Sequence, residues 1–492
     1  FTPDGNYIMG EAPGLRHFFV GAGFNAYGIA AGGGAGWTLA EWVMSGEQPL
    51  DLWSVDIRRF SDLHRDGDWV RERTLEAYGK HYTIAWPHEE YQSGRPRIVS
   101  PLYRRLKARH ACFGSKLGWE RPNWFAPAGV EPKDIYSMGR QNWFEAVGEE
   151  HRATRERAAL FDQSSFAKFE MRGKDAERAL EYICANRIAR PPGRLVYTQM
   201  LNSRAGIECD LTVARLEEDR FYIVTGTGFR THDFAWIRQH VAPGLEARLM
   251  DITEEYGTLS LMGPRARDIL QQVTDDPVGH EAFPFGHMRE IRIAGHKVRA
   301  LRVTYVGELG WELHMPIGVT GKVFDALVGA GAPHGLAMAG YRAIESLRLE
   351  KGYRAWGADI TPNETPHEAG LGWAVKLKSG VDFLGREAAL RQRDEGVGKR
   401  LAGFTIADPD VVLNGRETIY RDGEPVGWLT SGGWGYTLGT NIGYGYVRRA
   451  DAPVSNDWLD AGTYELEIAC ERFSCRMHRG VLFDPDMKRI KC

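Results

Sequence analysis

The stretch "VTYVGELGWELHMP", residues 303–316, predicts a β-hairpin. Its two ends are rich in apolar, β-branched and aromatic residues, which favour strands. Gly307 and Gly310 lie between them and are typical of a turn, so Glu312 falls on the return strand. A glutamate in a strand most often sits at a solvated edge, and on its own this hairpin indicates a structural element rather than a function.

Two further stretches combine regular structure with charged residues. "QMLNSRAGIECDLTVARL", residues 199–216, predicts a hairpin in which Asp210 begins the second strand. "YRAIESLRLEKGYRAWGADIT", residues 341–361, predicts a helix that ends at Gly352. Taken singly, each has an ordinary explanation: an aspartate near a turn, and a solvated helix face with alternating charge.

Together and in this order, the three stretches resemble the T-protein of the glycine cleavage system, a tetrahydrofolate-dependent aminomethyltransferase. "YVGELGWEL" is similar to its YTGExGxE motif, and "RAIESLRLEKGYRAWGADI" to its R-x-x-LRLExG helix. "AGIECDL" is similar to its glycine turn before an essential aspartate, and "TSGGWGYTLGTNIGYGYV" to the start of its C-terminal barrel. The resemblance implies a folate-binding domain over residues 117–390 and a small β-barrel over 398–484.

Pterin chemistry assigns roles to the matching residues. A carboxylate accepts two parallel N–H bonds, which suits the pterin N3–H and 2-amino group, so the resemblance implies that Glu312 binds the pterin with Tyr305 beside it. Asp210 would lie near folate N5 and N10, where a carboxylate orients the amine and takes up its proton. Arg342 resembles a position that meets the carboxylate end of folate.

The hairpin before Asp210 departs from the T-protein pattern at two positions. Ala205 stands where the family commonly has a second glycine, and Cys209 where it often has a first aspartate. Asp210 is therefore the carboxylate expected to act, and the adjacent Glu208 is the residue that could be mistaken for it.

A glycine-rich stretch, "VGAGFNAYGIAAGGGAGWTLAEWVMSG", covers residues 20–46. It does not match the dinucleotide-binding pattern GxGxxG, and no other part of the chain does. "HFFVGAG", residues 17–23, predicts a buried strand. Leu39, Trp42 and Val43 recur at helical spacing and predict a helix that ends at Gly46. A structural turn is the usual role of such a glycine cluster.

Residues 1–60 as a whole resemble the closing piece of the FAD domain in the dimethylglycine and sarcosine dehydrogenase family. The resemblance implies that residues 1–55 belong to an FAD-dependent oxidoreductase domain and that 56–116 form a connecting subdomain with two short helices. Gly28, Ile29 and Gly33 would adjoin the flavin. A helix starting near Gly32 would point its N-terminus at the pyrimidine edge, where reduced flavin carries negative charge.

Composition is that of an ordinary globular protein, of fold class α/β and α+β with several domains. The 492 residues correspond to roughly three domains. The net charge of -3 gives no electrostatic reason to expect a nucleic-acid partner. No apolar run approaches the roughly 20 residues needed to span a bilayer. The six cysteines form no metal-binding spacing, so we expect no metal site and a reducing compartment.

The combined resemblance implies oxidative demethylation of a small N-methyl amine such as dimethylglycine or sarcosine. FAD would be one cofactor, and tetrahydrofolate would receive the one-carbon unit as 5,10-methylenetetrahydrofolate. An electron-transfer flavoprotein is a possible electron acceptor, as is oxygen. The compartment would be the bacterial cytoplasm or the mitochondrial matrix. The FAD pyrophosphate loop is absent and the chain begins with Phe1, so we expect a portion of a longer protein or one half of a split protein.

Two alternatives remain open at this point. Some relatives of these dehydrogenases are non-catalytic regulatory subunits with the same architecture. A folate-dependent aminomethyltransferase or demethylase without flavin is the other possibility, although the first sixty residues argue against it.

Overall fold

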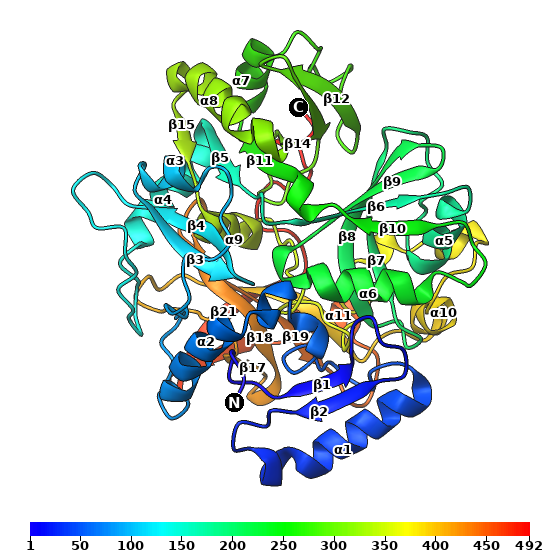
Figure 1. Ribbon diagram of the computed structural model, residues 1–492. Coiled ribbons are helices and arrows are strands. Elements are labelled where there is room, and N and C mark those ends of the chain that lie inside the picture. Colours follow the sequence, from blue (N-terminus) through cyan, green and yellow to red (C-terminus); the bar gives the residue numbers. More distant parts are fainter.

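The computed structural model describes residues 1–492, and Figure 1 shows the N-terminal segment packed along one side of the larger remainder of the chain. Strands β1 (Ile8–Glu11) and β2 (Phe19–Ala22) form an antiparallel pair against helix α1 (Gly28–Ser45). Gly46 ends the helix as predicted, with a φ of 78° that suits glycine. The helix starts at Gly28, one turn before the predicted start near Gly32, because the small residues that follow do not interrupt it.

Short helices dominate the segment that follows. Two 3₁₀ turns, η1 (Ile57–Arg59) and η2 (Asp62–Arg65), precede helices α2 (Gly67–Gly79) and α3 (Tyr103–Lys107). The Asp66 side chain accepts the Trp69 N–H at 3.1 Å and caps α2. Strands β3 (Ala111–Lys116) and β4 (Trp119–Phe125) then form a hairpin whose turn points to the middle of the molecule (Figure 1).

Two mixed layers of sheet and helix make up the central part of the chain. A five-stranded sheet has the order β10-β6-β9-β8-β7, and a six-stranded sheet the order β12-β13-β14-β11-β5-β15. The strands of the first sheet are β6 (Ala167–Arg172), β7 (Leu195–Leu201), β8 (Ile207–Glu217), β9 (Arg220–Thr225) and β10 (Arg248–Asp251). Those of the second are β5 (Ala158–Asp162), β11 (Tyr256–Met262), β12 (Met288–Ile293), β13 (His296–Leu301), β14 (Gly310–Pro316) and β15 (Leu336–Met338).

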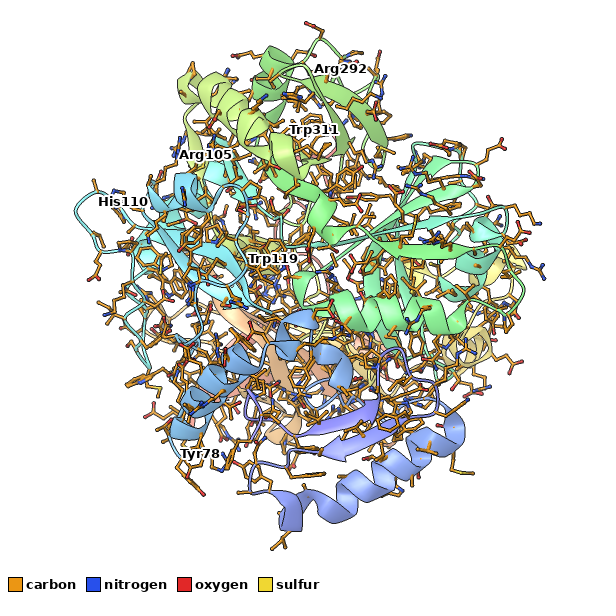
Figure 2. The ribbon with its side chains drawn as sticks, in the orientation of Figure 1. Tyr78, Arg105, His110, Trp119, Arg292 and Trp311 are labelled. Atoms are coloured by element: carbon orange, nitrogen blue, oxygen red, sulfur yellow. The ribbon has the colours of Figure 1, made fainter.

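Amphipathic helices cover these sheets. They are α4 (Phe144–Glu156), α5 (Ala176–Ile183), α6 (Arg230–His240), α7 (Ala266–Val273), α8 (Thr320–Gly331) and α9 (Tyr341–Glu350). Trp311 on β14 is fully buried in the largest apolar cluster, beneath α7 and α8 (Figure 2). The hairpin predicted over residues 199–216 is present as β7 and β8, and the helix predicted over 341–352 is present as α9.

The hairpin predicted over residues 303–316 is only half formed. Its return strand is β14, but β14 pairs with β13 and β11, and the residues from 302 to 309 form a loop. The loop is fixed locally, because the Thr304 hydroxyl accepts the N–H groups of Val306, Gly307 and Glu308. Tyr305 consequently lies in a loop rather than on a strand.

A closed antiparallel barrel completes the fold, as predicted. Its strand order is β16-β19-β18-β17-β20-β21. The strands are β16 (Lys399–Ile406), β17 (Thr418–Arg421), β18 (Glu424–Gly435), β19 (Thr440–Arg448), β20 (Tyr464–Ile468) and β21 (Glu471–His478), with helices α10 (Arg386–Glu395) and α11 (Asn456–Ala461) beside them. None of the helices in the molecule combines the length and apolar character that crossing a bilayer requires.

Candidate functional site

Asp210 lies on β8, directly opposite Gln199 on β7. The Gln199 Nε2 donates to its carboxylate at 3.0 Å. Burial raises the pKa of Asp210 to about 6, although hydrogen bonds from Tyr197 and Gln199 oppose the rise. The side chain is nevertheless partly exposed. A carboxyl group of this kind is mostly ionised at neutral pH and is still basic enough to accept a proton.

Arg354 brings Tyr305 and Asp210 into one neighbourhood. The Tyr305 hydroxyl donates to the Arg354 carbonyl at 2.9 Å, and its ring stacks on Tyr353 with 5.8 Å between centroids. The charge of Arg354 acts on Asp210 and lowers its pKa, against the larger effect of burial. The loop carrying Tyr305 and the hairpin carrying Asp210, about one hundred residues apart in sequence, thus face the same space.

Glu312 lies on β14 opposite Ser260 of β11, and its side chain is 12% exposed. Its nearest polar contact is His314, 3.6 Å between Oε2 and Nε2. Burial lowers the pKa of His314, so this imidazole is neutral at pH 7. No protein group donates a hydrogen bond to the Glu312 carboxylate, which leaves both oxygens available to a ligand with two N–H groups.

Arg342 occupies the first turn of α9, and its side chain is held by Asp134 and Trp143. It donates to Asp134 at 2.9 Å and its guanidinium lies 4.5 Å from the Trp143 ring centroid. It lines a cavity of about 360 Å³ together with Trp143, Trp434 and Glu345. Trp143 and Tyr305 pack against the same apolar cluster, which relates this cavity to the loop that carries Tyr305.

Arg348 and Glu350 on α9 are buried although Glu345 is exposed, so the alternating charges of this helix do not form a solvated face as expected. Arg348 donates to Asp359 at 2.6 Å and to Ser431 Oγ at 2.8 Å, and it is 1% exposed. Glu350 is fully buried and receives the N–H groups of Thr437 and Leu438 from the barrel. The helix is enclosed between β4, α4 and β18, and its charges therefore fix the barrel to the rest of the fold.

Gly28, Ile29 and Gly33 are exposed at the start of α1. No side chain caps this helix, because Tyr27 occupies the N-cap position, so the N–H groups of the first turn are free. A free helix N-terminus suits the electron-rich edge of a ring. Figure 1 places α1 at the periphery of the molecule, apart from β7 and β8.

The segment from 47 to 58 packs on the hairpin that carries Asp210. Glu47 accepts the Ser203 hydroxyl at 2.6 Å, and the Gln48 carbonyl accepts Arg204 Nη2 at 2.7 Å. The Trp53 ring lies 5.5 Å from Phe229 and 5.4 Å from Trp356, centroid to centroid. The residues that directly follow α1 therefore contact the hairpin that carries Asp210.

Sequence reasoning missed three residues that shape this site. Gln199 donates a hydrogen bond to Asp210 from the neighbouring strand, Tyr197 on the same strand favours the ionised carboxylate, and the charge of Arg354 acts on Asp210 from the segment after α9. Hairpin symmetry alone would have placed Gln199 opposite Cys209, and a bulge between Met200 and Leu201 shifts the register by one residue so that Gln199 pairs with Asp210. Arg354 had no local signal in the sequence, because its position depends on the packing of α9.

Replacement of the aspartate tests the raised pKa directly. We expect Asp210→Asn to raise the melting temperature at pH 7.5 but not at pH 4. In the unfolded chain the carboxyl titrates near 3.8 and in the folded protein near 6, so the ionised form costs the folded state about 3 kcal/mol above pH 6. That cost disappears as the pH falls from 6 to 4. Calorimetric melts of Asp210→Asn and of exposed Asp219→Asn give the comparison, and equal shifts for both would contradict the raised pKa.

Three known protein families match successive parts of this chain. The GCVT N-terminal domain matches residues 102–379, the FAD dependent oxidoreductase central domain residues 45–100, and the glycine cleavage T-protein C-terminal barrel domain residues 399–484. A crystal structure of glycine cleavage system aminomethyltransferase T from Bartonella henselae superposes with a TM-score of 0.66 at 27% identity, covering 79% of this chain and 98% of that one. The T-protein resemblance is confirmed.

Longer relatives match the whole chain. Mitochondrial sarcosine dehydrogenase of Mus musculus is 42% identical over 531 residues, which include all of this chain and 58% of the relative. The mitochondrial pyruvate dehydrogenase phosphatase regulatory subunit of Mus musculus is 36% identical and matches 97% of this chain and 56% of the relative. The resemblance to the sarcosine dehydrogenases is confirmed, and the chain spans a little over half the length of the relatives it matches.

Proposed function

This chain belongs to the glycine cleavage T-protein family and is homologous to sarcosine dehydrogenase, and on that premise we propose that the whole protein is an FAD- and tetrahydrofolate-dependent demethylase. It oxidises a small N-methyl amine such as sarcosine or dimethylglycine and transfers the one-carbon unit to tetrahydrofolate as 5,10-methylenetetrahydrofolate. The observation that carries the proposal is the docking of segment 47–58 on the hairpin that presents the accessible carboxylate of Asp210.

The residues present fit a folate. Glu312 has two oxygens without a protein donor, which match the N3–H and 2-amino group of a pterin. Tyr305 supplies an aromatic surface close to Asp210. Bound tetrahydrofolate supplies the amine nitrogens that accept the one-carbon unit. Arg342 is proposed to bind the carboxylate end of folate in the cavity that it lines. Asp134 already orients the Arg342 guanidinium there.

Asp210 is the proposed proton acceptor. As a folate nitrogen forms its new bond to carbon it must lose a proton, and a carboxylate with a pKa of about 6 is ionised at pH 7 and ready to accept it. Gln199 holds the carboxylate in place through its Nε2, and the partly enclosed surroundings limit competition from bulk water.

The start of α1 fits a flavin edge. Gly28 and Gly33 carry no side chain that would keep a ring away, and Ile29 is fully exposed beside them. The free N–H groups of the first turn and the helix dipole favour negative charge at this point. FAD, when bound, supplies the acceptor for the hydride taken from the amine. Oxygen or an electron-transfer flavoprotein would be the final electron acceptor, and the compartment would be the bacterial cytoplasm or the mitochondrial matrix.

Turnover of the whole protein with sarcosine or dimethylglycine, with and without tetrahydrofolate, tests the proposal. We expect free formaldehyde without the folate and 5,10-methylenetetrahydrofolate in its presence. Calorimetry should detect folate binding to this chain. Formaldehyde release that does not respond to tetrahydrofolate, together with no measurable folate binding, would contradict transfer at this site.

Replacement of Glu312 tests the pterin contact. We expect Glu312→Gln to weaken folate binding by about 10- to 100-fold, because a carboxamide cannot accept both pterin N–H groups and charged hydrogen bonds contribute about 1.5–3 kcal/mol. The measurement is the dissociation constant by calorimetry. Glu290→Gln, on exposed β12 of the same sheet, is the control and should bind folate normally. An unchanged constant in Glu312→Gln would remove Glu312 from the site.

A regulatory function is the second candidate, because a phosphatase regulatory subunit matches 97% of this chain. The visible spectrum of the whole protein separates the two. A flavin band bleached by an N-methyl amine supports the demethylase, whereas a protein without flavin supports the regulatory function. A flavin-independent aminomethyltransferase is disfavoured by the match of residues 45–100 to an FAD-dependent oxidoreductase domain.

A further inference from the structure

Two cations without acidic partners lie at the turn of the β3–β4 hairpin, which Trp119 marks near the middle of the molecule in Figure 2. The register pairs Gly114 with Arg121 and Lys116 with Trp119, which places Lys116 and Arg121 on the same face of the hairpin. We propose that Lys116 and Arg121 form a binding subsite for a carboxylate group, an inference that rests on the proposed function for the identity of the ligand.

Neither cation forms an ion pair. The charges that act on Lys116 are those of Arg121 and Glu90. Both oxygens of Glu90 are engaged, by Asn123 Nδ2 at 2.7 Å and by the Ser115 N–H at 2.6 Å. The Arg121 Nε is buried without any hydrogen-bond partner. Two like charges held together without a counter-ion are unfavourable unless an anion joins them.

The subsite is open to solvent. Lys116 keeps exposed surface, although the surrounding protein lowers its pKa by desolvation and the charge of Arg121 lowers it further. Lys116 is therefore accessible to a ligand although protein surrounds its charge. A Cβ built on Gly228 would lie 2.9 Å from the Lys116 Cε, so the glycine in turn η3 (Thr227–Phe229) gives the lysine stem its room.

Hydrogen-bond donors surround the two cations. The Arg121 guanidinium lies 4.0 Å from the centroid of the Tyr341 ring. The Tyr341 hydroxyl is 3.4 Å from the Ser165 hydroxyl, which is 2.8 Å from that of Thr227. An ammonium, a guanidinium and three hydroxyls make a set dominated by donors, and the planar fork of arginine matches a carboxylate in particular.

The subsite adjoins the proposed pterin contact through one loop. Ser165 belongs to the turn after β5 that also contains Gln163, and Gln163 Oε1 accepts the hydroxyl of Ser260. Ser260 is the residue opposite Glu312. A ligand whose ring reaches Glu312 therefore passes near this subsite. Two sources can supply its carboxylate: the folate glutamate, whose other carboxylate is proposed for Arg342, or an N-methyl amino acid.

Calorimetry on the purified chain distinguishes these sources. The probes are 5-formyltetrahydrofolate, tetrahydropteroate, which is a folate without its glutamate, and sarcosine. We expect Arg121→Gln and Lys116→Met each to weaken at least one carboxylate probe about tenfold or more. If a variant loses affinity for 5-formyltetrahydrofolate but not for tetrahydropteroate, the subsite binds the folate glutamate. If it loses affinity for sarcosine alone, the subsite binds the carboxylate of the amino acid.

Arg448→Gln is the matched control, because Arg448 is exposed on the barrel, stacks on Trp428 and has no ion pair. The subsite would be overturned if Arg121→Gln and Lys116→Met both bound all three probes as tightly as Arg448→Gln does. If the unaltered chain binds no folate, the proposed function fails, and the sarcosine arm still decides the subsite. Arg121→Lys, which keeps the charge, is the replacement if Arg121→Gln does not fold, and it should lose affinity because it lacks the fork.

Discussion

Asp210→Asn in the whole protein is expected to stop transfer of the one-carbon unit to tetrahydrofolate while oxidation of the amine continues. Loss of a positioned general base commonly costs 10²- to 10⁴-fold in rate, and we expect a decrease in that range. The asparagine keeps the size of the side chain and the contact with Gln199, so the loss would report the missing basic oxygen. Formation of 5,10-methylenetetrahydrofolate and bleaching of the flavin are measured separately.

The control for this prediction is Asp219→Asn, an exposed aspartate in the turn that follows β8. It should retain both activities. A proportional loss of oxidation and transfer in Asp210→Asn would contradict the separation of the two sites. Because the same variant is expected to melt at a higher temperature at pH 7.5, misfolding could not explain its inactivity.

Arg155→Met is expected to cause the largest loss of stability. Arg155 donates to Glu308 at 2.9 Å and to Glu350 at 3.1 Å, and all three side chains are at most 4% exposed. Removing it leaves two buried carboxylates short of positive charge, an arrangement that costs about 3–5 kcal/mol. The free energy of unfolding from urea titration, or the denaturation midpoint where unfolding is not two-state, measures the change.

Arg157→Met is the matched control, two residues away. Arg157 pairs with Glu149 at the surface, where both side chains are about half exposed, so its loss should cost about 1 kcal/mol or less. Arg155 also donates to the Val306 carbonyl at 2.7 Å and so supports the loop that carries Tyr305. We therefore expect weaker folate binding in Arg155→Met than in Arg157→Met. Equal effects on stability would show that Arg489 and His151 compensate for the lost arginine.

Local signals in the sequence accounted for the elements that present the site. Gly46 ended α1, Gly352 follows the end of α9, and the turn before Asp210 lies between two strands, because glycine and short polar residues favour turns wherever they occur. The prediction of a hairpin over residues 303–316 was wrong, although it relied on the same turn-forming residues. Its glycines do mark a turn, but the hydroxyl of Thr304 holds the residues from Val306 to Glu308 in a loop, and the strand that pairs with β14 ends at Leu301.

Turn residues and apolar periodicity act over about ten residues, and they were enough to predict the hairpin that carries Asp210 and the strand that carries Glu312. The order of the domains followed instead from the resemblance of longer stretches to known families. The tertiary structure alone decided that α9 is buried, that Arg155 joins Glu308 to Glu350, that Arg342 pairs with Asp134 and that Lys116 and Arg121 lack partners. The reason is physical: the state of a charge depends on the groups and solvent around it, and those groups come from elements up to two hundred residues apart, between which the sequence has no periodic signal.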